Sequence, residues 1–164
     1  MKKYVKCFDE VFDKTKPYAI MDGGARVIQV KKIVGTVGKC GELDKNFRYI
    51  KRSDISERSR WYRLKEAAEK YHFFPSIEVY QYEGQYYVVD GNRRTAAAKA
   101  LGMEFIDAHI KEYVHKSDKQ RMRGALSRRR FESETGLRNL DLAHENGYGI
   151  LLDEVISYPY GENT

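Results

Sequence analysis

Long apolar runs are missing from this sequence of 164 residues. No stretch approaches the roughly 20 apolar residues that a membrane-spanning helix needs, and the basic start Met1–Lys3 is not followed by the apolar core of a signal peptide. Proline is scarce, with three residues, and no segment has low complexity. We therefore expect a cytoplasmic protein with no membrane partner, ordered almost throughout.

Cysteine and histidine are too few and too scattered to indicate a metal site. Cys7 and Cys40 have no further cysteine or histidine at metal-ligand spacing, and no two of the four histidines lie at i,i+4. We therefore predict no metal site. Because disulfides are rare in the cytoplasm, we expect the two cysteines to be reduced, half-buried thiols.

Positive charge is in excess, with a net charge of +6, and it is concentrated in two segments. Residues 116–130 contain seven lysines or arginines and one acid, and residues 48–63 contain six against two acids. Such patches suit the phosphate backbone of DNA, without base-specific readout, although the first is equally typical of a solvated basic helix. The candidate nucleic-acid contacts are Lys119, Arg121, Arg123, Arg128, Arg129 and Arg130.

The N-terminal part is expected to form a helix, a turn and a strand. Apolar residues at helical spacing from Tyr4 to Phe12 predict an amphipathic helix of about three turns, ended by Pro17. Asp22–Gly24 predicts a turn. The β-branched residues of segment 26–34 predict a strand.

Two glycines surround small residues directly after this strand, in the segment Gly35–Lys39. Such a backbone can approach a ligand closely. The segment lacks the spacing of a Walker phosphate loop, so a plain turn is the alternative.

The middle of the chain is expected to form a helix and a β-hairpin. Residues 58–71 have a helical pattern with one aromatic and apolar face, which we expect to pack in the core. The alternating segments 77–82 and 85–89, joined by Glu83–Gly84, predict the hairpin.

One strand and one basic helix are predicted after residue 102. Segment 105–111 alternates, and we expect it to lie parallel to the second hairpin strand through a right-handed crossover. Ser117 and Gln120 predict a capping box that opens a helix toward Arg130. A short amphipathic helix is predicted at residues 147–156.

The stretch from Tyr86 to Gly102 carries the clearest chemical signal. A β-branched and aromatic run ends at Asp90–Gly91, and a helix-forming run starts at once, which predicts a strand, a tight turn and a helix. Arg93 and Arg94 fall in the first helical turn, where the helix dipole favours acidic residues. Free N–H groups and two guanidinium groups suit an anion, so we predict a phosphate-bearing ligand at Gly91–Thr95.

Other roles for these charges remain open. Arg93 and Arg94 could instead pair with nearby acids, the candidates being Asp90, Glu104 and Asp107. Asp90 could cap the turn or act as a metal-bound carboxylate.

This stretch resembles the nucleotide-binding core of the ParB N-terminal and sulfiredoxin superfamily. ParB-like proteins have an apolar strand, Asp-Gly-x-x-Arg, an alanine-rich helix ending in Leu-Gly, and a strand that often reads Ile-x-Ala-x-Ile/Val. These features correspond to Val88–Arg94, Ala97–Gly102 and Ile106–Ile110. A group of bacterial ParB-like proteins, labelled nucleases, also shares patterns seen at residues 33–39, 44–47, 135–137 and 147–152.

The resemblance implies an α+β fold of the ParB/sulfiredoxin type, with a small mixed sheet, packed helices and a short helical C-terminal extension. It also implies that the turn holds the phosphates of a nucleoside triphosphate, CTP or ATP, with Mg²⁺. The implied nucleotide-binding residues are Asp90, Gly91, Asn92, Arg93, Arg94 and Thr95, with Gly35, Thr36, Val37 and Gly38 lining the same pocket.

The sequence departs from the family pattern at Asn92. Sulfiredoxin has its reactive cysteine at this position, and many ParB proteins have a glutamate that takes part in nucleotide handling. The resemblance therefore does not extend to sulfiredoxin chemistry, and hydrolysis would lack that carboxylate. The helix-turn-helix domain that follows in ParB is not evident either.

We expect three segments: an N-terminal helix and turn (1–25), a ParB/sulfiredoxin-like core (26–115), and a basic helix with a helical tail packed on the core (116–164). The main hypothesis is a nucleotide-binding protein, with NTPase or small phosphotransferase activity as extensions. A kinase-like activity would need a general base, for which the candidates are Glu42, Asp44 and Asp54. The alternative is a DNA-binding regulator or nuclease that uses segment 116–130.

Overall fold

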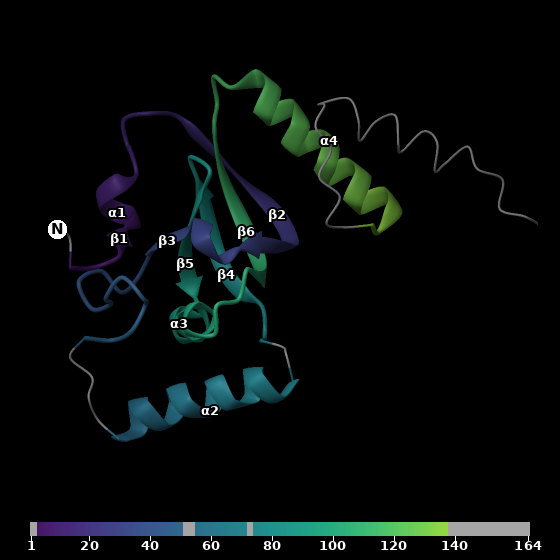
Figure 1. Ribbon diagram of the computed structural model, residues 1–164. Coiled ribbons are helices and arrows are strands. Elements are labelled where there is room, and N and C mark those ends of the chain that lie inside the picture. Colours follow the sequence, from purple (N-terminus) through teal and green to yellow (C-terminus); the bar gives the residue numbers. More distant parts are fainter. Residues whose placement is uncertain (1–2, 51–54, 72–73, 138–164) are drawn as a thin grey trace, which may run out of the picture.

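The computed structural model describes residues 3–50, 55–71 and 74–137 (Figure 1). They form a mixed, six-stranded sheet with the order β1-β3-β5-β4-β6-β2, so the fold is α+β, as predicted. The strands are β1 (Lys6–Cys7), β2 (Tyr18–Gln29), β3 (Ile33–Thr36), β4 (Ile77–Tyr82), β5 (Gln85–Asp90) and β6 (Phe105–His115). The helices are α1 (Phe8–Val11), α2 (Ile55–Tyr71), α3 (Asn92–Ala100) and α4 (Lys119–Thr135).

The main core lies between the sheet and α3, and α2 packs on the outer side of α3 (Figure 1). The alanines at positions 96–98 are at most 2% exposed, and their small side chains let α3 lie close to Ile77 and Val79 of β4. From α2, Ala68 is buried, and Trp61 and Leu64 pack against the same core. The predicted apolar face of this helix is confirmed.

The β4–β5 hairpin and the helix after it are confirmed. β4 and β5 pair antiparallel, and the turn residues Glu83 and Gly84 have φ values of 50° and 75°, as the tight turns of hairpins require. β5 ends at Asp90, and Gly91, with φ 112°, precedes the first residue of α3. A Cβ atom at Gly91 would lie 2.5 Å from Cγ2 of Ile77, so no side chain fits between this turn and β4.

The neighbour predicted for β6 is wrong. β6 pairs parallel with β4 and antiparallel with β2, so it runs parallel to the first hairpin strand and lies beyond β4 from β5. Alternation in a sequence shows which face of a strand is buried, but it does not identify the adjacent strand. The connection through α3 therefore passes across β4.

The N-terminal prediction also needs correction. Lys6–Cys7 is a strand, and α1 contains only Phe8–Val11. The aromatic residues of this segment belong to a side-chain cluster instead. In this cluster the Phe8 and Phe12 rings stack with centroids 5.2 Å apart. Phe8 also contacts Tyr80, Tyr82, Tyr87 and Tyr113.

Asp22–Gly24 forms an irregularity within β2 and not the predicted turn. The register with β6 shifts between Asp22 and Gly24, and the Gly24 N–H donates to Asp22 Oδ1 at 2.8 Å. β2 thereby continues across residues 25 and 26, where a segment boundary was expected. The single strand predicted for residues 26–34 is divided by a 3₁₀ turn at Val30–Lys32.

The expectation of two free thiols is wrong. Cys7 in β1 and Cys40 after β3 form a disulfide, with their Cα atoms 5.2 Å apart. The two residues are separated by 33 positions in the sequence, and no local pattern predicts that the fold brings them together.

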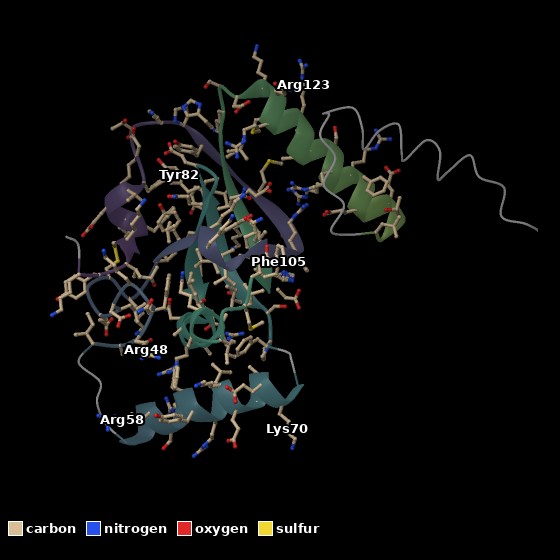
Figure 2. All side chains as sticks on the ribbon, viewed as in Figure 1. Arg48, Arg58, Lys70, Tyr82, Phe105 and Arg123 are labelled. Carbon is tan, nitrogen blue, oxygen red and sulfur yellow. A yellow bond between two sulfur atoms is a disulfide. The ribbon has the colours of Figure 1, made fainter. Side chains whose placement is uncertain are left out.

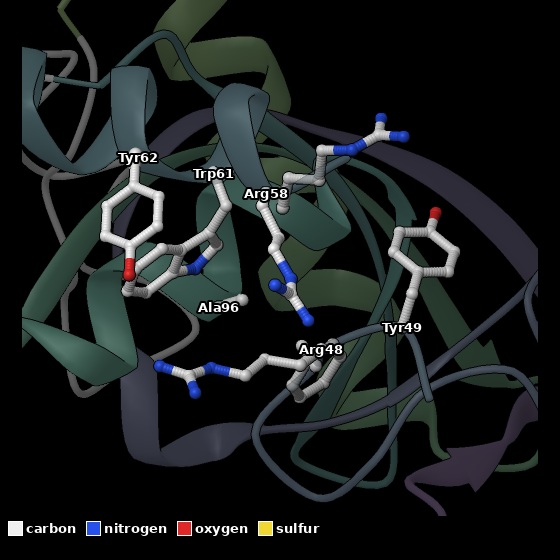
Figure 3. Close-up of a pocket in the computed structure, with 8 residues that line it drawn as sticks. Arg48, Tyr49, Arg58, Trp61, Tyr62 and Ala96 are labelled. Atoms are coloured by element: carbon white, nitrogen blue, oxygen red, sulfur yellow. The ribbon is translucent and has the colours of Figure 1, made fainter. Parts of the chain in front are cut away.

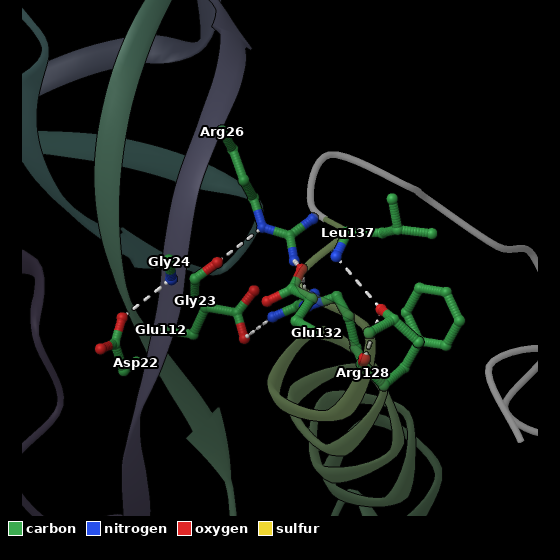
Figure 4. Close-up of polar contacts among 10 residues, drawn as sticks. Asp22, Gly23, Gly24, Arg26, Glu112, Arg128, Glu132 and Leu137 are labelled. Carbon is green, nitrogen blue, oxygen red and sulfur yellow. Dashed lines mark hydrogen bonds and ion pairs between the residues drawn. The ribbon is translucent and has the colours of Figure 1, made fainter. Parts of the chain in front are cut away.

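An ion-pair network connects α4 to the sheet (Figure 4). Arg26 of β2 contacts Glu132 at 2.9 Å, and Arg128 contacts Glu112 of β6 at 2.6 Å. All four side chains are at most 14% exposed. The helix cap is Asp118, whose Oδ1 accepts from the Arg121 N–H at 3.0 Å, so the predicted capping box at Ser117 is wrong by one residue.

Two predictions lie outside the described residues: the helix at 147–156 and the candidate base Asp54. No helix in the described part of the chain is both long and apolar enough to cross a lipid bilayer. Within residues 3–50, 55–71 and 74–137, no His, Cys, Asp and Glu side chains gather in a group that could hold a metal ion.

Candidate functional site

The start of α3 has no side-chain cap among the described residues. Gly91 occupies the N-cap position and makes no side-chain cap hydrogen bond, and the first N–H group that bonds back to Gly91 O is that of Thr95, at 2.9 Å. The Thr95 hydroxyl donates to the same carbonyl at 2.9 Å. The N–H groups of the first helical turn therefore have no partner within the helix.

Arg94 holds the turn in place. Its Nη2 contacts Asp90 Oδ2 at 2.8 Å, and its Nη1 donates to Ser76 O at 2.6 Å. The Arg94 side chain is 19% exposed, whereas that of Asp90 is 70% exposed. The alternative of pairing with Asp90 is therefore realised by Arg94, which links the turn to the residues before β4.

Arg93 takes a different direction from Arg94. Its guanidinium lies over the Tyr49 ring, 5.2 Å from the centroid. Arg93 and Ala96 form the α3 side of a pocket with a volume of about 290 Å³. The two adjacent arginines of the sequence therefore have separate roles, one in the turn and one at the pocket.

Three separate segments of the chain line this pocket (Figure 3). The loop after β3 contributes Phe47, Arg48 and Tyr49, and α2 contributes Arg58, Trp61 and Tyr62. Figure 2 shows Arg48 and Arg58 at the same end of the molecule, away from Arg123 on α4. No carboxylate lines the pocket among the described residues, so its charge is positive.

Aromatic rings support the arginines of the pocket. The Arg48 guanidinium lies 4.6 Å from the centroid of the Trp61 ring, and the Trp61 and Tyr62 rings meet edge to face with centroids 5.2 Å apart. Lys99 lies over the Phe47 ring at 5.5 Å, and burial lowers the pKa of its ammonium group. A flat ligand that carries negative charge would find stacking surfaces and cations together here.

Asp44 shapes the loop that presents Arg48. Its Oδ1 accepts from the N–H groups of Asn46 at 2.8 Å and Arg48 at 3.0 Å. Phe47, with φ 65°, is 1% exposed and anchors the loop in the core. The carboxylate proposed from the sequence as a general base thus accepts hydrogen bonds from this loop.

Two buried polar atoms near α2 and α3 have no hydrogen-bond partner among the described residues. They are Nε1 of Trp61, a donor, and Oδ1 of Asn92, an acceptor. Asn92 is 8% exposed and is the first residue of α3. Buried polar atoms normally have partners, so these two are available to a ligand or to water.

The segment 35–38 ends beside the turn but does not line this pocket in the described part of the chain. Gly35 and Thr36 belong to β3, and Thr36 is fully buried. The Val37 N–H donates to Val88 O at 2.9 Å, so the chain leaves β3 next to the end of β5. Gly38 has open space around its Cα.

The structure thus adds pocket residues that the sequence analysis had placed elsewhere. Trp61 lies on the helix face that was expected in the core, and it both packs against the core and lines the pocket. Arg48 and Arg58 were counted only as part of a basic segment. That clustering of charge in residues 48–63 was the available signal. It did not indicate that the loop and α2 would face Arg93.

The basic residues of α4 are partly occupied by ion pairs. Arg128 contacts Glu112, and Arg130 contacts Glu134 at 2.9 Å. The exposed basic positions along the helix are Lys119, Arg121, Arg123, Arg129 and Arg130.

Comparison with known proteins identifies the family. The model of the ParB N-terminal domain matches residues 41–127. Three solved structures are similar: sulfiredoxin from Arabidopsis thaliana (19% identity over 57% of this chain and 85% of that chain, TM-score 0.38), a Pnob8-like ParB-N domain (17%, 84% and 47%, TM-score 0.36), and C-terminally truncated chromosome-partitioning protein ParB from Caulobacter crescentus complexed with CTP-gamma-S (17%, 82% and 66%, TM-score 0.41). No curated protein matches the sequence.

Proposed function

The chain belongs to the family of ParB N-terminal domains, and on this premise we propose that it binds a nucleoside triphosphate at the pocket beside α3. The observation that carries the proposal is the gathering of Arg48, Arg58 and Arg93 with three polar aromatic side chains, without a carboxylate among the described lining residues. A nucleotide has the matching chemistry, because it combines a flat base with a polyanion.

The phosphates are assigned to the α3 start and to the pocket arginines. The N–H groups of the first turn, which have no partner within the helix, and the helix dipole favour an anion at Gly91–Thr95. Arg93 stands between that turn and the pocket, and its guanidinium can donate to phosphate oxygens. Arg94 contributes by fixing the turn through Asp90 and Ser76.

The base is assigned to the aromatic side of the pocket. Trp61 and Tyr62 from α2 and Tyr49 from the loop offer ring faces and edges, and stacking of a base on an aromatic side chain contributes about 1–3 kcal/mol. The unpaired Nε1 of Trp61 is a donor in this region. In this arrangement the segment 35–38 borders the phosphates from the end of β3.

Binding is the activity that these residues support, with turnover as a further step. Asp44 accepts hydrogen bonds within its own loop, and Asp90 is held by Arg94. Asn92 stands where a glutamate would supply a carboxylate. We therefore propose a cytoplasmic nucleotide-binding domain that holds CTP or ATP with Mg²⁺. Asp44 and Asp90, which have other partners, are not assigned as a general base for attack on the γ-phosphate.

Calorimetric titration tests this proposal. CTP, ATP and ADP are each added with Mg²⁺. Cytidine and adenosine, which lack the phosphates, are the comparison ligands. At least one nucleotide should bind, and its nucleoside should bind far more weakly. Arg93→Ala should raise the Kd about ten- to a hundredfold, since a charge-assisted hydrogen bond contributes about 1.5–3 kcal/mol.

Arg129→Ala is the matched control, because Arg129 is an exposed arginine on α4 outside the pocket. It removes the same charge and should leave the Kd unchanged. If no nucleotide binds in a phosphate-dependent way, or if both variants weaken binding equally, the proposed site is wrong.

Non-specific DNA binding along α4 is the second candidate, favoured by the exposure of Lys119, Arg121 and Arg129. Binding through phosphate contacts should weaken steeply with salt, with a slope of about 0.9 per contacted phosphate in a double-logarithmic plot. A duplex-binding measurement at several salt concentrations, repeated with Lys119→Ala/Arg121→Ala, would show a reduced slope. Weak binding that is independent of salt would exclude this function.

A further inference from the structure

The Cys7–Cys40 disulfide closes a short path of contacts that leads to the candidate pocket. Cys7 lies in β1, and Cys40 lies in the segment between β3 and the loop that carries Arg48. They are the two cysteines of the whole sequence. The bond therefore joins the N-terminal strand to the chain that leads directly into the pocket.

The backbone of β1 has few other partners, although its neighbours Val5 and Phe8 pack in the main core and in the aromatic cluster. It pairs with β3 through two residues, Lys6 opposite Gly35 and Cys7 opposite Thr36. Just before it, the Val5 N–H donates to Leu43 O at 3.3 Å, and Tyr4 forms an isolated bridge with Asp44. So short a strand is weak by itself, and the disulfide helps to keep Tyr4 and Val5 against Asp44 and Leu43.

The same residues order the pocket loop. Leu43 is fully buried and forms a bridge with Tyr49. The Asp44 N–H donates to Arg48 O at 2.9 Å, and the Ile50 N–H donates to Glu42 O at 3.0 Å. Tyr4 and Val5, directly before β1, contact one side of the segment 42–44, and the other side of that segment holds Arg48 and Tyr49 in position.

We propose that Cys7 and Cys40 form a reversible redox site that controls ligand affinity at the pocket beside α3. In the oxidised protein, β1 supports the segment 42–44 and the loop with Arg48 and Tyr49 is ordered for binding. In the reduced protein, β1 is released, the loop loses order, and affinity falls. This inference rests on the proposed nucleotide site, whose regulation it describes.

The exchange reaction has an accessible target. Cys40 is exposed, whereas Cys7 is 7% exposed, and a second pocket of about 410 Å³ lined by Lys3, Tyr4, Lys6 and Gly41 opens beside Cys7. The thiolate of an external dithiol attacks Sγ of Cys40, the bond between the two Sγ atoms breaks, and Cys7 leaves as a thiolate that takes up a proton.

The second thiol of the reductant completes the exchange. It attacks the mixed disulfide, so Cys40 is released as a thiol and the reductant becomes a disulfide. Two electrons and two protons have then passed from the dithiol to the protein. Disulfides in cytoplasmic proteins, the location that we expect for this chain, are usually catalytic or redox-sensing.

A purely structural disulfide gives a different result. A cross-link of that kind acts mainly on the unfolded chain, so its loss lowers stability without changing the affinity of the molecules that remain folded. The measured quantity must therefore be the Kd of the folded protein. Circular dichroism spectra recorded in parallel should show that the secondary structure is unchanged.

The experiment compares the oxidised and the dithiothreitol-reduced chain in the nucleotide titration above, with thiols counted by a maleimide label. Reduction under native conditions should expose two thiols and raise the Kd by about tenfold. This is the change expected if binding must also order roughly one backbone residue. Cys7→Ser/Cys40→Ser should have the reduced affinity with or without dithiothreitol. An unchanged Kd, or a disulfide that resists native reduction, overturns the proposal.

Hydrogen exchange separates this outcome from failure of the proposed function, because it needs no ligand. The N–H groups of Asp44, Phe47 and Ile50 should exchange faster in the reduced protein, and those of β4 should not change. If this occurs but no nucleotide binds, the nucleotide function is wrong and the redox-controlled loop stands. If exchange at the loop is the same in both states, the coupling is wrong even when nucleotide binds.

Discussion

Gly91 and Gly102 have left-handed backbone conformations, with φ 112° and 64°, but their surroundings differ. A Cβ at Gly91 would meet Ile77 Cγ2 at 2.5 Å, whereas a Cβ at Gly102 would meet nothing within 4 Å. Gly102→Ala should therefore show only the conformational cost, roughly 1–2 kcal/mol. Gly91→Ala adds a clash between the turn and β4, which costs about another 1–3 kcal/mol.

Urea denaturation of the two variants measures this difference. Gly91→Ala should also weaken nucleotide binding, because relief of the clash displaces the start of α3. Equal losses of stability would show that the contact with Ile77 relaxes freely and that the turn is not fixed by close packing.

Arg93 and Arg94 illustrate what residue types alone could predict. The sequence indicates that two arginines at a helix start are unusual, and both the anion and the ion-pair interpretations follow from that. Which arginine serves which role depends on direction around the helix and on Ser76 and Tyr49, which come from other parts of the chain. The structure gives Arg94 the ion pair with Asp90 and places Arg93 at the pocket.

At the scale of elements, α4 is attached to the sheet by Glu132, which is held between Arg26 and Arg128. The Glu132 side chain is 8% exposed. Glu132→Gln would remove the counter-charge of the buried Arg26, whereas Arg128 would keep Glu112. Breaking a buried pair in this way typically costs about 3–5 kcal/mol.

Glu134→Gln is the matched control on the same helix. Its partner Arg130 is 73% exposed and Glu134 is 40% exposed, and exposed pairs contribute about 0–1 kcal/mol. Urea titration gives the free energy of unfolding of each variant. The loss of this free energy should be several times larger in Glu132→Gln than in Glu134→Gln. Similar small losses would mean that solvent screens the Arg26–Glu132–Arg128 network.

Elements with local signals were predicted well, and those set by distant partners were not. The β4–β5 hairpin and α3 follow from alternation, from Glu83–Gly84 and from the alanines before Gly102. The neighbours of β6 were missed because strand order is a property of the whole sheet. The N-terminal helix was wrong because Phe8 and Phe12 have a spacing that suits a helix, while their contacts lie on β4, β5 and β6.

At the scale of the whole molecule, both the disulfide and the pocket are products of long-range assembly. Cys7 meets Cys40, and Arg48 and Trp61 face Arg93, only after β1, the loop, α2 and α3 are in place. Composition could indicate that cations and aromatics were abundant. It could not indicate that they would share one pocket, since that depends on how α2 packs over α3.

The aromatic cluster under α1 gives the whole molecule a sensitivity to alkali. Tyr18 donates a hydrogen bond to the Tyr82 hydroxyl at 3.4 Å, and this bond, with burial, raises the pKa of Tyr18 to about 12. Burial also raises the pKa values of Tyr87 and Tyr113. Because these folded-state values lie above those of the unfolded chain, the fold favours the neutral phenols.

The sign of the pH effect follows from this. The contribution of the neutral phenols is fully present below pH 10, the ordinary pKa of tyrosine, and it is lost as the pH rises toward about 12. The free energy of unfolding should be level between pH values of about 8 and 9 and fall steadily above about 10. Tyr18→Phe removes one of these phenols, so its stability should decline less steeply, whereas the exposed Tyr62→Phe should keep the original slope. A stability that stays constant to about pH 11, or equal slopes in both variants, would show that the cluster does not hold its phenols neutral.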